Sequence, residues 1–335
     1  MRPTCFKGWN IQIVDSRDSG KFPCLEIDGN SNPHISYLDV SNNDIMYAHW
    51  TGITWDIQNI TTNGAAGAYS FLALDRSGNP HIIYYDIITN EIKYSQKTDT
   101  GWNTITVEGG KEAGTGISLT LDASDVPHIC YYDFETEELK YAKFSEGLWL
   151  TRTVENVDCG EGLYHTSLIV DGSGNPHISY YDGANENLKY AHIINSSWVI
   201  ELVDGSGNVG YPNSLHLDKN NNPHISYYDE SNEYLKYARL ENSSWFIETV
   251  DRDGNVGMNS SIALDSCGNP HISYFDITNH VLKYAHFTGS CWIIEIVDSS
   301  SDVGWDCFLS IDIEDNPSIA YYDLSNGCLK YAKLV

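Results

Sequence analysis

Short runs in which apolar and polar residues alternate fill most of this chain. The run His271-Ile-Ser-Tyr-Phe-Asp276 is typical, since it is rich in β-branched and aromatic residues and follows the turn segment Asp265-Ser-Cys-Gly-Asn-Pro270. Alternation over roughly four to eight residues, bounded by Gly, Asn and Pro, predicts half-buried β-strands. We find no helical periodicity over a segment long enough for a helix. The pattern therefore predicts an all-β fold.

The run at His271 belongs to a repeat that occurs seven times. In each copy a proline is followed two places later by Ile, four places later by Tyr and six places later by Asp. The prolines are Pro33, Pro80, Pro127, Pro176, Pro223, Pro270 and Pro317. They lie 47 residues apart, except for one spacing of 49. A fixed period of this length indicates an array of equivalent structural units.

Each repeat contains four strand-like runs, which in the sixth copy are residues 261–265, 271–276, 281–285 and 292–297. A tryptophan opens the fourth run in six copies: Trp55, Trp102, Trp149, Trp198, Trp245 and Trp292. Four antiparallel strands repeated seven times predict a seven-bladed β-propeller.

The two ends of the chain supply complementary parts of one repeat. The seventh copy stops at Val335 after its third run, and Trp9-Asn-Ile-Gln-Ile-Val-Asp15 matches the missing fourth run. We therefore expect residues 1–335 to form one domain in which an N-terminal strand completes blade seven. The alternative is that this strand inserts into a neighbouring copy, giving self-assembly instead of a monomer.

With these motifs the chain resembles the β-propeller superfamily that is closed by a terminal strand, over essentially its whole length. The tryptophan that opens the outer strand is similar in style to that of propeller lectins.

Charge narrows the choice of partners. The chain has 46 acidic and 19 basic residues and a net charge of −27. A field of this sign repels nucleic acids and anionic membrane surfaces, so we expect neither as a partner. No apolar run approaches the roughly 18 residues that span a bilayer, and no signal peptide is apparent at Met1.

The cysteines and glycosylation sequons favour an extracellular or cell-surface setting with disulfides. The eight cysteines show no C-x-x-C spacing, and they are Cys5, Cys24, Cys130, Cys159, Cys267, Cys291, Cys307 and Cys328. Asn-x-Ser/Thr sequons occur at Asn59, Asn195, Asn242 and Asn259.

Six histidines directly follow the repeat prolines, from His34 to His271, with Ser318 in the seventh copy. A catalytic base needs one histidine in a unique environment, whereas these six are equivalent. We interpret them as structural, and we predict neither catalytic nor metal-binding residues among them.

The aspartates that end the second run should pair with the lysine seven positions later, because the two lie on one face of the blade. Met46 replaces this lysine in the first copy, so Asp39 is a candidate ligand-binding residue. Aligned carboxylates also suit calcium, which is the one cofactor we consider. The segment Asp251-Arg-Asp-Gly-Asn255 resembles a calcium loop but lacks the distal glutamate.

A second group of candidates lies where we expect loops to cross the mouth of the central channel. A shared glycine there is followed by a residue that changes between copies: Lys21, Ala68, Thr115, Tyr211, Met258 and Trp305, with Leu163 roughly equivalent in the fourth. We predict that Trp305, Tyr211, Met258 and Lys21 form an apolar wall beside one cation, where a ligand binds. The alternative is that these side chains only plug the channel.

The leading functional hypothesis is a non-enzymatic recognition or structural module that binds a protein or glycan on its upper face. A carbohydrate-binding lectin is the first alternative. A sialidase-like, glycan-processing enzyme is the second, although the chain has only six arginines and no G-x-S-x-G or H-E-x-x-H motif.

Overall fold

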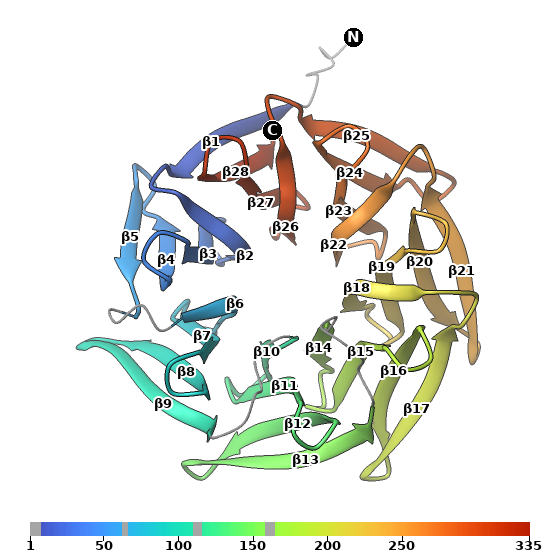
Figure 1. The fold of residues 1–335 in the computed structure, drawn as a ribbon, viewed down its shortest axis with the longest axis horizontal. Helices are drawn as coiled ribbons and strands as arrows, with labels where there is room; N and C mark the ends of the chain where they lie inside the picture. Colours follow the sequence, from blue (N-terminus) through green and yellow to red (C-terminus); the bar gives the residue numbers. More distant parts are fainter. Residues whose placement is uncertain (1–7, 62–65, 110–115, 158–164) are drawn as a thin grey trace.

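The protein is a ring of seven four-stranded antiparallel sheets, each of which forms one blade (Figure 1). This computed structural model describes residues 8–61, 66–109, 116–157 and 165–335. The described residues form no helix, and hence no helix that could cross a membrane. The predicted all-β propeller is confirmed.

In blades 1 to 6 the strands run outward from the channel in chain order, and in every blade the innermost strand lines the channel. Blade 1 contains β2 (Ser19–Ile27), β3 (Pro33–Asp39), β4 (Asp44–Trp50) and β5 (Trp55–Asn59). Blade 2 contains β6 (Ala66–Leu74), β7 (Pro80–Asp86), β8 (Glu91–Thr98) and β9 (Gly101–Gly109). Blade 3 contains β10 (Ser118–Leu121), β11 (Pro127–Asp133), β12 (Glu138–Ser145) and β13 (Leu148–Asn156). Blades 4 and 5 contain β14 (Thr166–Val170), β15 (Pro176–Asp182), β16 (Asn187–Ile194) and β17 (Ser197–Asp204); β18 (Val209–Leu217), β19 (Pro223–Asp229), β20 (Tyr234–Glu241) and β21 (Ser244–Asp251). Blades 6 and 7 contain β22 (Val256–Leu264), β23 (Pro270–Asp276), β24 (Val281–Phe287) and β25 (Trp292–Asp298); β26 (Val303–Ile311), β27 (Pro317–Asp323), β28 (Cys328–Leu334) and β1 (Trp9–Asp15). We call the face at which the inner strands begin the upper face.

The N-terminal strand closes the ring within one chain. Strand β1 pairs antiparallel with β28, with Trp9 opposite Leu334 and Ile13 opposite Lys330. Blade 7 therefore has the order β1-β28-β27-β26, and β1 lies outside β28 near the C-terminus in Figure 1. This confirms the predicted closure by the N-terminal strand.

An aspartate stabilises the hairpin between the first two strands of each blade. In blade 6, Asp265 Oδ1 accepts hydrogen bonds from the backbone N–H groups of Cys267 (2.9 Å) and Asn269 (2.7 Å), while the Asn269 side chain donates to Oδ2 (2.8 Å). The histidine after the hairpin proline then contacts this aspartate: His128 Nε2 lies 3.3 Å from Asp122 Oδ2.

Each repeat histidine forms a hydrogen bond within its own blade. The other ring nitrogen of His128 shares a hydrogen bond with the Tyr141 hydroxyl (2.6 Å). The same pair forms in the other blades, with serine in the seventh: His34–Tyr47, His81–Tyr94, His177–Tyr190, His224–Tyr237, His271–Tyr284 and Ser318–Tyr331.

The outer-strand tryptophan of each blade packs edge-on against that tyrosine in the preceding blade. Trp292 meets Tyr237 with ring centroids 5.4 Å apart, and Trp9, on the closing strand, meets Tyr284 at 5.1 Å. The remaining five contacts are Trp55–Tyr331, Trp102–Tyr47, Trp149–Tyr94, Trp198–Tyr141 and Trp245–Tyr190. The series thus links all seven blades into a closed ring.

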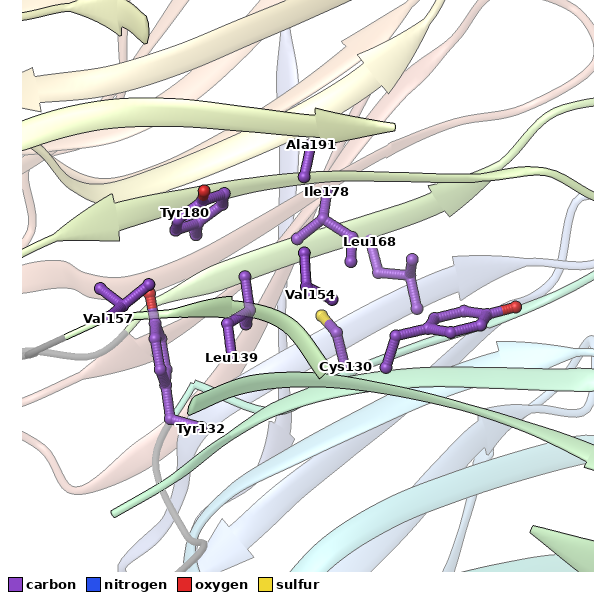
Figure 2. Packing of buried hydrophobic residues seen from close by; sticks show 10 residues of the cluster. Cys130, Tyr132, Leu139, Val154, Val157, Leu168, Ile178, Tyr180 and Ala191 are labelled. Carbon is purple, nitrogen blue, oxygen red and sulfur yellow. The ribbon is translucent and has the colours of Figure 1, made fainter. Parts of the chain in front are cut away.

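The apolar cores lie between neighbouring blades. Figure 2 shows the core between blades 3 and 4, where Cys130 and Leu139 from one blade face Leu168 and Ile178 from the next. The shared glycine at the start of the inner strand permits this packing. A Cβ atom added to Gly257, whose φ is +108°, would lie 2.7 Å from the Leu235 Cα in the preceding blade.

The predicted lysine–aspartate pairs form in five blades. They are Lys140–Asp133, Lys189–Asp182, Lys236–Asp229, Lys283–Asp276 and Lys330–Asp323. In blade 2, Lys93 pairs with Glu91 instead. Blade 1 has Met46 at this position, and Arg17, which follows β1, binds Asp15 at the end of β1 in blade 7 through two contacts (2.8 and 2.7 Å).

The disulfide prediction is not confirmed. Cys24, Cys130, Cys307 and Cys328 are buried free thiols, and Cys267 and Cys291 are exposed free thiols. Cys5 and Cys159 lie outside the described residues. In this structure, hydrogen bonds and apolar cores link the blades.

Removal of the closing strand should abolish cooperative folding. A chain lacking residues 1–16 exposes the edge of β28 and leaves Tyr284 without Trp9, so we expect a broad unfolding transition or aggregation. A chain lacking only residues 1–7 keeps β1 and is the control. Thermal unfolding followed by circular dichroism tests this, and an unchanged melting temperature without residues 1–16 would refute the closure.

Acid should unfold the protein through the repeat histidines. Burial lowers the pKa of His34, His128, His177 and His224 to about 4. Because the folded pKa is lowered, the unfolded chain binds these protons first, and stability falls as the pH drops from about 6.5 to about 4.

The histidine contribution can be measured one residue at a time. Each buried histidine contributes a slope of up to about 1.4 kcal/mol per pH unit in this window. His128→Ser copies the native Ser318–Tyr331 pair and should remove about one proton from the uptake on unfolding. Urea titrations between pH 4 and pH 7 report this number, and an unchanged slope would contradict the assignment.

Candidate functional site

A cavity of about 520 Å³ lies on the axis of the ring and is lined by the inner strands of all seven blades. Tyr211 of β18, Met258 of β22 and Trp305 of β26 line it together, from three consecutive blades. Trp305 is 42% exposed, and its ring packs edge-on against Phe275 with centroids 5.3 Å apart. The structure thus brings three of the five predicted ligand-binding residues to one place.

The other two predicted residues do not line this cavity. Lys21 places its ammonium group 5.8 Å from the centre of the Tyr322 ring. Asp39 is 6% exposed, and its Oδ1 accepts the backbone N–H groups of Ser41 (3.0 Å) and Asn42 (3.2 Å). Asp39 thus stabilises a turn. Thr115 and Leu163 lie outside the described residues, as does the side chain of Ala68.

One local prediction was wrong. We expected the variable residues to lie in loops, but the inner strands begin earlier than the sequence indicated. Met258 pairs with Phe275 inside β22, and the register then shifts before Ser261 pairs with Ser273. In such irregular pairing the segment stays in the sheet, but its side chains no longer alternate strictly between the two faces. As a result, two consecutive residues, Met258 and Asn259, both line the cavity.

The sequence analysis missed a buried carboxyl group directly after Trp305. Asp306 is only 7% exposed. Its Oδ2 accepts the Phe22 backbone N–H (3.3 Å), and its Oδ1 accepts the Asn259 side-chain amide (3.2 Å). Among the described residues no cation forms an ion pair with it. Burial raises the pKa of Asp306 to about 6, with the Phe22 hydrogen bond and the charge of Lys21 acting weakly in the opposite direction.

Aromatic residues from other blades surround this carboxyl group. Tyr69 of β6 packs against Phe22 with ring centroids 4.4 Å apart. Burial raises the pKa of Tyr69, and the charges of Tyr211 and Asp306 add to the shift. Tyr211 also lies 6.5 Å from the His165 ring, measured between centroids. The signal for these residues was the variation eleven positions before each repeat proline, where the sequence reads Phe22, Tyr69, Gly116, His165, Pro212, Asn259 and Asp306.

Deeper in the cavity, serine hydroxyl groups form hydrogen bonds that connect neighbouring blades. The Ser167 hydroxyl accepts the Leu215 backbone N–H of the next blade (3.0 Å), and Ser118, Ser214 and Ser261 do the same in their blades. Glu26 of β2 is different, because burial raises the pKa of its carboxyl group to about 7. The described lining contains no lysine and no arginine. The cavity therefore offers aromatic surface and carboxyl groups.

The structure also distinguishes the sequons. Asn195 and Asn242 are exposed at hairpin tips between the third and fourth strands. Asn259, in contrast, lies in the channel lining with its amide bonded to Asp306. A glycan on Asn259 would break that contact. No three His, Cys, Asp or Glu side chains among the described residues are grouped so that they could hold a metal ion.

Comparison with known proteins identifies the fold only. No family model and no curated protein matches the chain. Among solved structures, the SapL1 lectin in complex with α-methyl fucoside aligns with a TM-score of 0.59 at 12% identity, covering 84% of this chain and 98% of the lectin. The Aleuria aurantia lectin in complex with Fucα1-6GlcNAc gives 0.54 at 13%, covering 87% and 99%. The polysaccharide lyase Uly1 gives 0.58 at 9%, covering 94% and 90%.

Neutralising Asp306 should stabilise the protein at neutral pH. Its folded pKa is raised, so its contribution to stability is greatest in acid and is lost as the pH rises through about 6. Asp306→Asn should therefore gain up to about 3 kcal/mol relative to the wild type between pH 4 and pH 7. Urea unfolding at several pH values measures this, with exposed Asp253→Asn as the control. If the difference in unfolding free energy between the variant and the wild type did not change with pH, the raised pKa of Asp306 would be contradicted.

Proposed function

We propose that this protein is a non-enzymatic, carbohydrate-binding propeller that holds one glycan per chain at the channel mouth on its upper face. The observation that carries the proposal is an exposed indole, Trp305, next to a nine-tenths buried carboxyl group, Asp306, at the rim of a 520 Å³ cavity. Sugars present apolar C–H faces and hydroxyl donors. An aromatic ring and a carboxylate match these two features.

We expect one ligand per chain because residues at the channel mouth do not recur in the other copies of the repeat. The His–Tyr and Trp–Tyr contacts recur around the ring and hold the blades together. Trp305, Asp306 and Asn259 have no counterparts of the same type in the other copies. A ligand that needs these residues together binds once. The likeness to two lectin complexes supports the fold, and it is consistent with this use of it.

Catalysis has less support. A glycosidase needs two carboxyl groups roughly 5 to 9.5 Å apart. Glu26 and Asp306 both line the cavity, but Glu26 lies four repeat positions further along the inner strand, which corresponds to about 13 Å of strand rise. The shifts that raise the pKa of Tyr69 and Tyr211 also disfavour either phenol as a nucleophile.

A glycan-processing enzyme remains the second candidate, because the pKa of Asp306, about 6, suits a general acid. Incubation of the protein with each bound glycan, followed by mass spectrometry of the products, separates the two. Intact glycan supports the binding function, and cleavage supports the enzyme.

We place the protein outside the cell. The acidic surface and the exposed sequons at Asn195 and Asn242 support this setting. Expression through a secretory pathway, with mass spectrometry of the peptides that carry Asn195 and Asn242, tests whether these positions are modified.

Loss of the aromatic rim should abolish binding. A glycan array identifies a ligand, and calorimetry should then give one site per chain. Trp305→Ala combined with Tyr211→Ala should weaken binding at least about 30-fold, since an aromatic anchor contributes about 2 kcal/mol or more. The control is Phe246→Ala, which removes an exposed aromatic residue from outer strand β21. Binding that survives the double change with folding intact would refute the site.

A further inference from the structure

We infer that the glycan end that enters the channel carries an ammonium group, so that the ligand is an amino sugar whose nitrogen lies beside Asp306. This inference rests on the proposed function and specifies its ligand. It follows from three observations: the cavity is lined by carboxyl groups but by no lysine or arginine in its described part, aromatic side chains surround Asp306, and the protein carries a net negative charge.

The charge of the cavity is uncompensated. Asp306 and Glu26 both line it, whereas the described lining contains no lysine or arginine. The nearby cation, Lys21, faces the Tyr322 ring and forms no ion pair with Asp306 among the described contacts. A buried carboxylate without a counter-charge is costly unless a cation accompanies it. A ligand ammonium group would supply that cation and donate three hydrogen bonds.

The titration of the two carboxyl groups agrees with this balance. Burial is the main reason why the pKa of Asp306 rises to about 6 and that of Glu26 to about 7. Elsewhere, lysines or amides hold aspartates ionised: Lys283 and Asn279 lower the pKa of Asp276. Asp306 has only two long hydrogen bonds for this purpose.

The walls of the cavity suit a cation as well. Tyr69, Tyr211 and Trp305 line the region around Asp306, and the π-face of an aromatic ring attracts an ammonium group. An acidic sugar would meet two carboxyl groups and a protein of net charge −27. The same field attracts cationic ligands. The site thus discriminates against uronic and sialic acids.

The pH dependence follows from the groups around Asp306. These are Lys21 on β2, Tyr69 on β6, Tyr211 on β18, Cys307 on β26 and Tyr322 on β27. Burial raises the pKa of each phenol and of the Cys307 thiol, so none of them ionises near neutrality. Asp306 therefore dominates the titration next to the ligand, and affinity should fall about tenfold per pH unit below about 6.

The test compares three trimers by calorimetry at pH 7: β-1,4-linked glucosamine, its fully N-acetylated form, and a uronic acid trimer. We expect the glucosamine trimer to bind at least about tenfold more tightly than the acetylated one, and the uronate not to bind. Asp306→Asn should reduce this preference to less than about threefold and remove the loss of affinity below about pH 6. Asp253→Asn removes an exposed upper-face charge and should change neither. Melting curves confirm that each variant is folded.

The outcomes separate the inference from the proposed function. If Asp306→Asn leaves the preference unchanged, or if the acetylated trimer binds equally well, the inference is wrong. If neither trimer binds but another glycan does so through Trp305 and Tyr211, the proposed function stands and the inference falls. If the glucosamine trimer binds through Asp306 without needing Trp305 or Tyr211, the ammonium site stands and the proposed rim fails.

Discussion

The contact on which the whole structure depends is the edge-on packing of an outer-strand tryptophan against a tyrosine of the preceding blade. Each such pair contributes only about 1 kcal/mol beyond the apolar area that it buries. In a ring, however, every blade has two neighbours, and the last interface forms only if all the others have the same geometry. Trp9 completes this series because β1 is paired with β28. The repeat therefore specifies the angle between blades as well as the blades themselves.

This constraint explains which residues recur. The tyrosine that packs against the tryptophan is hydrogen bonded to the repeat histidine, as Tyr141 is to His128. The other ring nitrogen of this histidine contacts the hairpin aspartate. The glycines at the start of the inner strands of blades 1, 5, 6 and 7 let neighbouring blades approach closely, since a Cβ atom there would collide with the preceding blade. The inner-strand residues at the upper face do not belong to this repeated set, and they differ from blade to blade.

The acidic residues also fall into two groups, those of the repeat and those that line the cavity. The aspartates of the repeat are neutralised by lysine or satisfied by turn amides, so a net charge of −27 coexists with a well-paired framework. Asp306 lies outside that framework. It is buried by the closing of seven inner strands around one axis, and its neighbours are mostly aromatic. An isolated carboxyl group in an aromatic cavity is what gives this otherwise regular ring a distinctive chemical site.

The sequence by itself determined the period, the number of blades and the closure by Trp9–Asp15. These depend on spacing and alternation, which are local along the chain and reinforced seven times. It also pointed to Trp305, Tyr211 and Met258, because they break the repeat. Only the tertiary structure showed that Lys21 and Asp39 lie outside the cavity lining, and that Asp306, Asn259 and Tyr69 belong to it. The physical reason is that irregular strand pairing turns two successive residues toward the axis, and that burial there depends on all seven blades at once.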